Sequence, residues 1–223
     1  MTLSLFRLVT PVGAIGQGLL AAYVWRFGNP GPIPMHFGLD GTVDRYGDRT
    51  QAALLIVGMM VLSIIVGLMI DASARMPEGD ETRRRGLAVA KALGVGVLCL
   101  VSALMAVLAL SLHPTQLMGG HGLTLLFCGL FAVVGAVMGK VPPNAFVGVR
   151  TAWSLNSRLA WDRSNRLAGR LFLCFGLIGM VGSLFLSQRL AMPILVVGVL
   201  IIAGLSIFES WRVWRSDPDR QAV

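Results

Sequence analysis

Six long apolar stretches, separated by gaps that alternate between strongly basic and nearly neutral, constrain the fold of this chain more than any other feature. Each stretch has about the 17–25 residues that an α-helix needs to cross the hydrocarbon core of a bilayer. The stretches are Leu8–Trp25, Ala52–Asp71, Ala92–Leu112, Gly122–Gly139, Leu171–Ser187 and Met192–Trp211. With 55% hydrophobic and 13% charged residues, the chain has too little polar surface to coat a soluble globule. The sequence therefore predicts an all-α polytopic membrane protein with six transmembrane helices.

Lysine and arginine are distributed unevenly between the two sides that six crossings imply. The side that holds both termini has 15 of the 19 basic residues, and the other side has four. Because basic residues near helix ends stay in the cytoplasm, we expect both termini to be cytoplasmic. The same bias accounts for the formal charge of +8, so we expect no direct binding of nucleic acid. The three cysteines lie inside apolar stretches without a CxxC spacing, which indicates neither a disulfide framework nor a zinc knuckle.

The first gap, residues 26–51, is predicted to be an outer loop. Its Gly, Pro and Asp residues favour turns over long regular elements. His36 precedes Asp40 and Asp44 at four-residue intervals, and converging His and carboxylate groups can bind a divalent metal. Alternatively, these side chains satisfy the loop backbone and pair with neighbouring arginines. Both interpretations stay open at this point.

The fourth gap, Lys140–Arg170, is long and basic. From about Ser154 it predicts a helix that lies at the headgroup level before it turns into the fifth span. Trp153 and Trp161 would share one face of that helix if it is continuous, and we expect both rings to anchor the loop in the interface. Arg150 either recognises a carboxylate or phosphate with two parallel hydrogen bonds or only anchors the loop.

Small and polar residues inside the stretches predict how the helices pack. Gly135 and Gly139 form a GxxxG pair, and further glycines line the fifth and sixth stretches. We interpret these glycines as contacts between helices of one chain rather than as a dedicated dimer face. Gln17 is the best candidate for an intramembrane polar group, and in lipid its amide must find a partner or a water-lined cavity.

Together, the two unusual loops resemble the signatures of the SdpI-type bacterial immunity protein family. Its members are six-span membrane proteins with an outer P-x-H-F/W-x-x-x-G-x-x-D segment and a later G-(N/K)…N-x-F-x-G-I-R-T-P-W-T-L…W…H-R segment. The residues that match the first segment are Pro34, His36, Gly41, Asp44 and Tyr46. Those that match the second are Gly139, Asn144, Phe146, Gly148, Arg150, Thr151, Trp153, Leu155, Trp161 and Arg166. The departures are Ala152, Ser154 and Asn165, where the family usually has Pro, Thr and His.

The resemblance implies a division of the chain and a set of binding residues. Residues 1–75 would hold the first two spans and the outer loop, and residues 76–223 a four-span SdpI-like region with a cytoplasmic motif loop at 139–170. The implied binding residues of the motif loop are Asn144, Phe146, Gly148, Arg150, Thr151, Trp153, Trp161, Asn165 and Arg166. Those of the outer loop are Pro34, His36, Asp40, Gly41, Asp44 and Tyr46, of which His36, Asp40 and Asp44 are the candidate metal ligands.

The resemblance also implies a function, namely protection of a cell against a secreted toxic peptide, with possible docking of a cytoplasmic repressor. The protein would then be a multi-pass protein of the bacterial cytoplasmic (inner) membrane, with membrane lipids, the toxic peptide and a repressor as its partners.

Two other classes of function stay open. A small transporter or exporter is disfavoured because no charged residue lies mid-span and no internal repeat is visible. A membrane enzyme would have His36, Asp40 and Asp44 as its acid–base or metal set, but the sequence shows no activated nucleophile. We therefore expect a non-enzyme without a cofactor, a divalent metal in the outer loop being the one exception. The sequence does not predict the oligomeric state.

Overall fold

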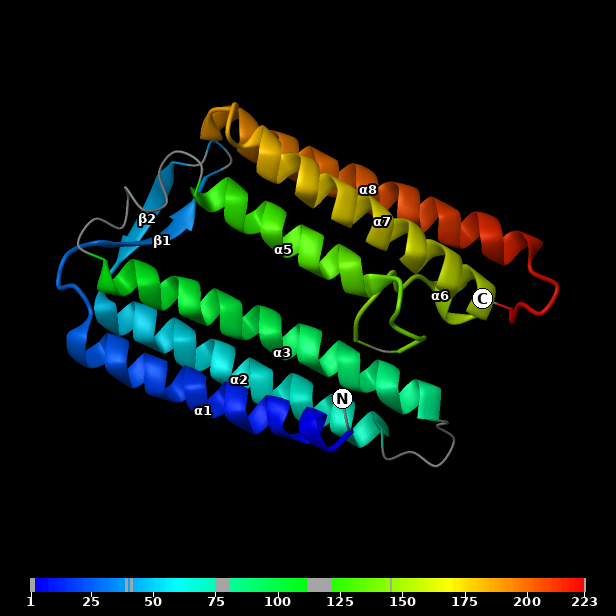
Figure 1. Cartoon of the computed structure of the whole chain (residues 1–223), viewed down its shortest axis with the longest axis horizontal. Helices are drawn as coiled ribbons and strands as arrows, with labels where there is room; N and C mark the ends of the chain where they lie inside the picture. The colour runs from blue at the N-terminus through cyan, green and yellow to red at the C-terminus, as the bar shows by residue number, and fades with distance from the viewer. Residues whose placement is uncertain are drawn as a thin grey trace. The chain divides into compact units, whose positions relative to one another are not determined.

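The computed structural model describes residues 3–38, 40, 42–74, 81–111, 122–144 and 146–222, which form long helices and one short hairpin. In chain order the elements are α1 (Leu3–Phe27), β1 (Ile33–Phe37), β2 (Val43–Gly47), α2 (Arg49–Ala74), α3 (Glu81–Leu110), α5 (Gly122–Met138), α6 (Ala152–Leu155), α7 (Arg158–Gly182) and α8 (Gln188–Ser216) (Figure 1). Among the described residues, five helices are long and apolar enough to cross a membrane, and α5 is a shorter apolar helix. Each predicted stretch falls on one of these six helices, so the predicted all-α polytopic membrane protein is confirmed.

The fifth predicted span begins earlier than the sequence indicated. Helix α7 runs without a break from Arg158 to Gly182, so no separate headgroup-level helix turns into a span at residue 171. The break lies before α7 instead, where Ser157 has extended backbone and its hydroxyl accepts a hydrogen bond from the Ala160 N–H at 2.9 Å. A serine in this position caps a helix and stops its extension backwards. The prediction of an interfacial helix continuous with residue 154 is therefore wrong.

The first gap contains a hairpin that its Gly- and Pro-rich composition did not predict. Strands β1 and β2 pair antiparallel, with Ile33 opposite Gly47 and Phe37 opposite Val43. The turn is closed by a hydrogen bond from the Gly38 N–H to the Thr42 carbonyl oxygen at 2.8 Å. Residues 26–51, which contain this pair of strands, are called the hairpin loop below.

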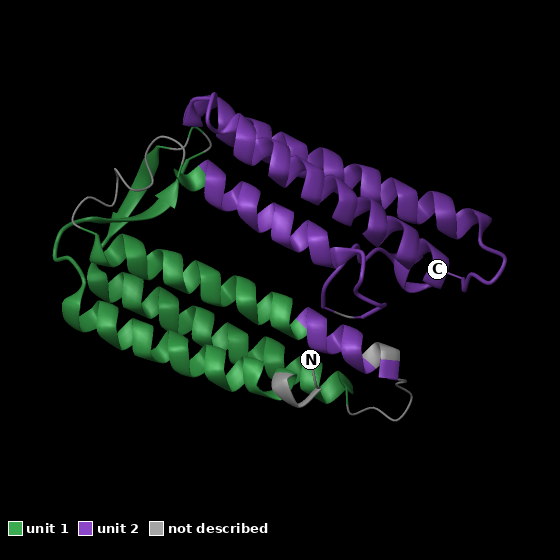
Figure 2. Ribbon diagram, in the orientation of Figure 1, with its two compact units in different colours: residues 1–79, 91–123 green, residues 80–90, 124–223 purple. Residues whose placement is uncertain are grey.

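The described residues pack into two compact units, Met1–Gly79 with Lys91–Leu123 and Asp80–Ala90 with Thr124–Val223 (Figure 2). We call them unit 1 and unit 2. The predicted division of the chain at residue 75 stays a prediction, because these units are defined by packing and not by family resemblance.

Unit 1 contains α1, α2 and most of α3, which lie side by side (Figure 1). Two buried polar contacts join its helices. The Gln17 amide nitrogen donates to the Ser102 hydroxyl at 3.0 Å, so the predicted partner is present for the nitrogen, whereas the amide oxygen is buried without a partner among the described residues. Lys91 is 2% exposed and its ammonium lies 2.7 Å from an Asp71 carboxylate oxygen. Lys91 lies in the gap between the second and third apolar stretches, and the structure buries it within the unit.

Unit 2 contains α5, α7 and α8, which also lie side by side, with the short α6 at one end (Figure 1). Helices α5 and α7 approach so closely at Gly135 that an added Cβ would lie 2.7 Å from the carbonyl oxygen of Gly169. A further contact of the same kind lies at Gly176, where an added Cβ would be 2.5 Å from the backbone nitrogen of Ala132. Small residues permit such backbone contacts in lipid. The prediction that the glycines pack within one chain is confirmed for Gly135 and Gly176 but not for Gly204 of α8, which has no neighbouring atom within 4 Å of an added Cβ.

Candidate functional site

The motif loop, residues 139–170, is held from within by the side chain of Asn144. Its amide nitrogen donates to the carbonyl oxygens of Pro142 and Val147 at 2.8 and 3.0 Å. Its amide oxygen accepts from the backbone N–H groups of Phe146 and Val147 at 2.7 and 2.8 Å. These four bonds use the full hydrogen-bonding capacity of an asparagine side chain. Asn144 was predicted as a binding residue, and in this structure it shapes the turn.

The side chains of Asn165 and Trp161 pack against the backbone of the motif loop at Gly148. This residue has φ +129°, and a Cβ there would lie 2.6 Å from the Asn165 amide oxygen and 2.9 Å from the Trp161 ring. Glycine alone tolerates such a backbone conformation without strain. Asn165 is 1% exposed, and it accepts from the Val149 N–H at 2.8 Å and donates to the Trp161 carbonyl oxygen at 2.9 Å.

Trp161 lies inside unit 2 and not at a lipid-facing surface. Its side chain is fully buried, and the indole N–H donates to the Val141 carbonyl oxygen at 2.9 Å. The prediction that it anchors the loop in the headgroup region is therefore wrong, because the ring fills the space beneath the loop. Trp153 is half-buried and lies on α6, which ends before α7 begins. The two tryptophans consequently do not share one face of a single helix.

The three departures from the family pattern are compatible with this local structure. Ala152 is the first residue of α6, a position where proline is well tolerated but is not needed. Ser154 keeps the hydroxyl of a threonine, which donates to the Val149 carbonyl oxygen at 2.6 Å. Asn165 supplies one donor and one acceptor, as a neutral histidine would. The titratable group is absent at this position, and Asn165 makes its hydrogen bonds through an amide instead.

Helix α8 and the residues after it brace the same loop. The Thr151 hydroxyl, which caps α6, lies 2.8 Å from the Ser210 hydroxyl of α8. Ser157 donates to a carboxylate oxygen of Asp217 at 2.5 Å, and Asp217 is 6% exposed. Sequence reasoning missed Ser157, Ser210 and Asp217. A serine just before a helical segment is a usable sequence signal for an N-cap at Ser157. Its hydrogen-bond partner Asp217 is 60 residues away and could not be predicted from the sequence.

Arg150 is one of the motif residues that lie exposed on this framework. It is exposed, and its side chain makes no hydrogen bond or ion pair with any residue in the described part of the chain. Arg166 is exposed as well, whereas Phe146 is half-buried. The predicted binding set therefore splits into a buried scaffold, made of Trp161 and Asn165 with the half-buried Asn144 and Gly148, and an exposed cationic part.

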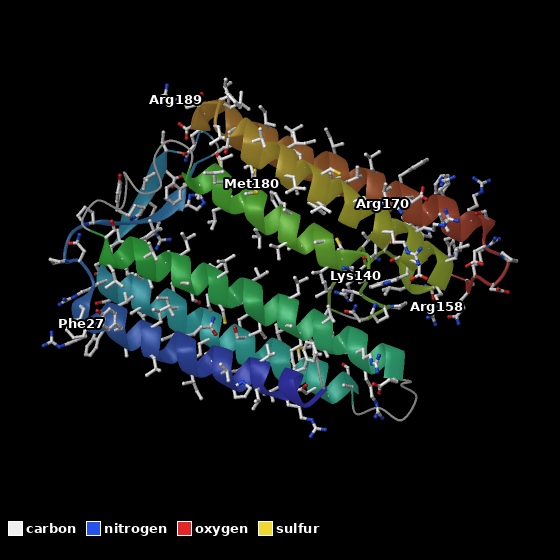
Figure 3. The ribbon with its side chains drawn as sticks, in the orientation of Figure 1. Phe27, Lys140, Arg158, Arg170, Met180 and Arg189 are labelled. Atoms are coloured by element: carbon white, nitrogen blue, oxygen red, sulfur yellow. The ribbon has the colours of Figure 1, made fainter. Side chains whose placement is uncertain are left out.

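A groove of about 520 Å³ opens beside the motif loop within unit 2. Its walls come from the first turns of α3, the start of the motif loop and the first turns of α7. The lining residues are Glu81, Arg85, Gly86, Val89, Gly139, Lys140, Val141, Pro142, Arg158, Asp162 and Arg166. Figure 3 shows Lys140 and Arg158 toward the end of unit 2 that is opposite Arg189. We call this feature the basic groove, because four cations line it against two carboxylates.

The hairpin loop brings together two of its three candidate metal ligands. His36 Nδ1 lies 2.7 Å from Asp44 Oδ1, with 66% and 50% of the two side chains exposed. The Asp40 carboxylate accepts from the N–H and the hydroxyl of Thr42 at 3.1 and 2.7 Å. Among the described residues, no group of three His, Cys, Asp or Glu side chains has an arrangement that could hold a metal ion. The metal site stays a prediction.

The remaining residues of the outer motif have simple positions. Pro34 is buried and pairs in register with Tyr46, which is 49% exposed. Gly41 lies outside the described residues. The expectation that the chain is not an enzyme also stays a prediction.

Comparison with known proteins identifies relatives of both regions. The model of the SdpI/YfhL protein family matches residues 140–210, which contain most of the motif loop, α6, α7 and most of α8. A domain of unknown function, DUF1648, matches residues 13–61, which contain the hairpin loop. The immunity protein SdpI of Bacillus subtilis (strain 168) is 30% identical over 87 residues, which are 38% of this chain and 42% of that protein. No solved structure matches the chain.

Proposed function

Because residues 140–210 match the SdpI/YfhL protein family, we propose that this chain is a membrane immunity protein that protects a cell against a secreted toxic peptide. The resemblance is supported by the motif residues of both loops. The similarity to the Bacillus immunity protein covers 42% of that protein's length, so the protective activity is our extension from that relative to this chain.

The proposed orientation places both termini and the motif loop in the cytoplasm, and the hairpin loop outside the cytoplasmic membrane. The uneven distribution of 15 and four basic residues supports it. Topology reporters fused at the C-terminus and after Ser187, which are separated by α8 alone, should report opposite sides. Activity of a periplasm-only reporter at the C-terminus would overturn the orientation.

The motif loop is the proposed docking site for a cytoplasmic regulator. The observation that carries this proposal is an exposed Arg150 without an intramolecular partner in the described part of the chain, on a loop whose backbone is fixed by buried Asn165 and Trp161. A guanidinium binds a carboxylate through two parallel hydrogen bonds, which a lysine ammonium cannot reproduce. A fixed loop reduces the entropy that binding costs. We propose that Arg150 takes a carboxylate of the regulator.

Substitutions of Arg150 distinguish docking of a regulator from anchoring of the loop in the headgroup region. Arg150→Ala should leave the protein in the membrane but weaken docking by roughly tenfold to a hundredfold, with loss of resistance in a strain that the wild-type chain protects. Arg150→Lys should rescue only in part. Arg189→Ala is the matched control, because Arg189 is also exposed and lies at the other end of unit 2 (Figure 3).

Two outcomes contradict the docking role. Full resistance with Arg150→Lys would leave only an anchor, since any long cationic side chain can reach the headgroups. Disappearance of Arg150→Ala protein from the membrane fraction would show that the residue is structural. Both outcomes leave the immunity proposal itself testable with the wild-type chain.

A further inference from the structure

The basic groove collects more positive charge than its own carboxylates can neutralise. Arg85 is paired with Glu81 at 3.0 Å. Lys140, Arg158 and Arg166 make no hydrogen bond or ion pair through their side chains with the described residues, and Asp162 is the remaining carboxylate in the lining. Among the described residues, three unpaired cations thus line one groove with a single unpaired acid.

Close backbone contacts hold together the segments that carry these cations. Arg158, Asp162 and Arg166 follow at four-residue intervals on one face of α7, and all three line the groove. Lys140 follows directly after Gly139. A Cβ added at Gly139 would lie 3.3 Å from the Cα atom of Arg166, so the two backbones are in close contact. On the opposite wall Gly86 of α3 packs against the Pro142 ring. Like charges held this way repel one another unless an anion lies between them.

We propose that the basic groove binds the phosphate group of an anionic phospholipid. Basic pockets at the ends of membrane helices bind anionic headgroups, and this groove lies where α5 ends and α7 begins. Val89, Val141 and Pro142 add apolar surface to its lining, which suits the first acyl carbons of a lipid better than a free ion. The inference does not rest on the proposed immunity function, and it uses cations other than Arg150.

The experiment compares the melting temperature of the purified full-length protein in nanodiscs of phosphatidylcholine with that in nanodiscs that also contain phosphatidylglycerol. A ligand that binds only the folded state raises its stability, so phosphatidylglycerol should raise the melting temperature. Inorganic phosphate added to phosphatidylcholine nanodiscs distinguishes the two sources of the group. A rise with inorganic phosphate but not with phosphatidylglycerol would overturn the lipid and leave a phosphate site for a soluble ligand.

Substitutions then locate the site. Lys140→Ala and Arg158→Ala should each weaken the apparent affinity for phosphatidylglycerol about fivefold, and together they should remove the rise in melting temperature. Both side chains are exposed, so their loss should not prevent folding. Asp162→Asn removes the unpaired acid and should strengthen binding by up to about fivefold, a gain that misfolding cannot produce. Arg189→Ala should behave as the wild type does.

Two further results would overturn the proposal. One is a melting temperature that responds neither to phosphatidylglycerol nor to inorganic phosphate. The other is a rise of the same size in the wild type, in the Lys140→Ala/Arg158→Ala double variant and in Asp162→Asn. In that case the bilayer charge would act on the whole protein and not through the basic groove.

Discussion

The hairpin loop and the motif loop both carry family-motif residues, but different parts of the chain hold them in shape. In the hairpin loop the backbone of β1 and β2 pairs with itself, and the side chains of His36 and Asp44 are left exposed. In the motif loop the backbone before α6 is irregular, and the side chains of Asn144, Asn165 and Trp161 hydrogen-bond to it.

Because of this difference, motif residues have different roles in the two loops. Strand pairing satisfies backbone N–H and C=O groups without particular side chains, so a motif side chain on a hairpin is available for binding. An irregular loop has backbone groups that must be satisfied by other means, and several residues of its motif are consequently structural. In the motif loop, Arg150 is therefore the proposed binding residue, whereas Asn165 and Trp161 hold the backbone in the conformation that positions it.

The largest effect is expected from removing the scaffold of the motif loop. Trp161→Ala should lower the free energy of unfolding by about 3–5 kcal/mol, because it leaves a cavity and an unpaired Val141 carbonyl group. Trp153→Ala is the matched control, since Trp153 is half-buried and makes no hydrogen bond through its side chain with the described residues. Unfolding in detergent with increasing denaturant measures both. Equal losses for the two variants would remove the distinction between scaffold and exposed residues.

The helices could be predicted from the sequence because the membrane imposes one requirement on each of them. About twenty apolar residues and their own hydrogen bonds suffice, which is why all six stretches fall on helices. The partner of Gln17 was predictable in the same way, as an uncompensated amide is costly in lipid. Its identity, Ser102, was not, because 85 residues separate the two.

The motif loop could not be predicted to the same extent. A tryptophan among arginines suits a headgroup-level helix as well as a buried position, and only the Val141 carbonyl group and Gly148 decide for burial at Trp161. Lys91 posed a similar problem. Its position at the end of an apolar stretch indicated a loop cation, whereas its partner Asp71 lies on another helix. In both cases the deciding contact is distant in the sequence.

The smallest effect is expected in the hairpin loop, where the exposed pair of His36 and Asp44 can be removed without loss of the strand pairing. His36→Ala should change the free energy of unfolding by less than about 1 kcal/mol. The melting temperature of the wild type should be the same with zinc, manganese or a chelator, because Asp40 accepts a hydrogen bond from Thr42 and no three-ligand set forms among the described residues. A zinc- or manganese-dependent rise that His36→Ala abolishes would contradict this expectation. In that case side chains of the hairpin loop would stabilise it through a metal ion. The two loops would then no longer differ in whether backbone pairing or side chains hold them in shape.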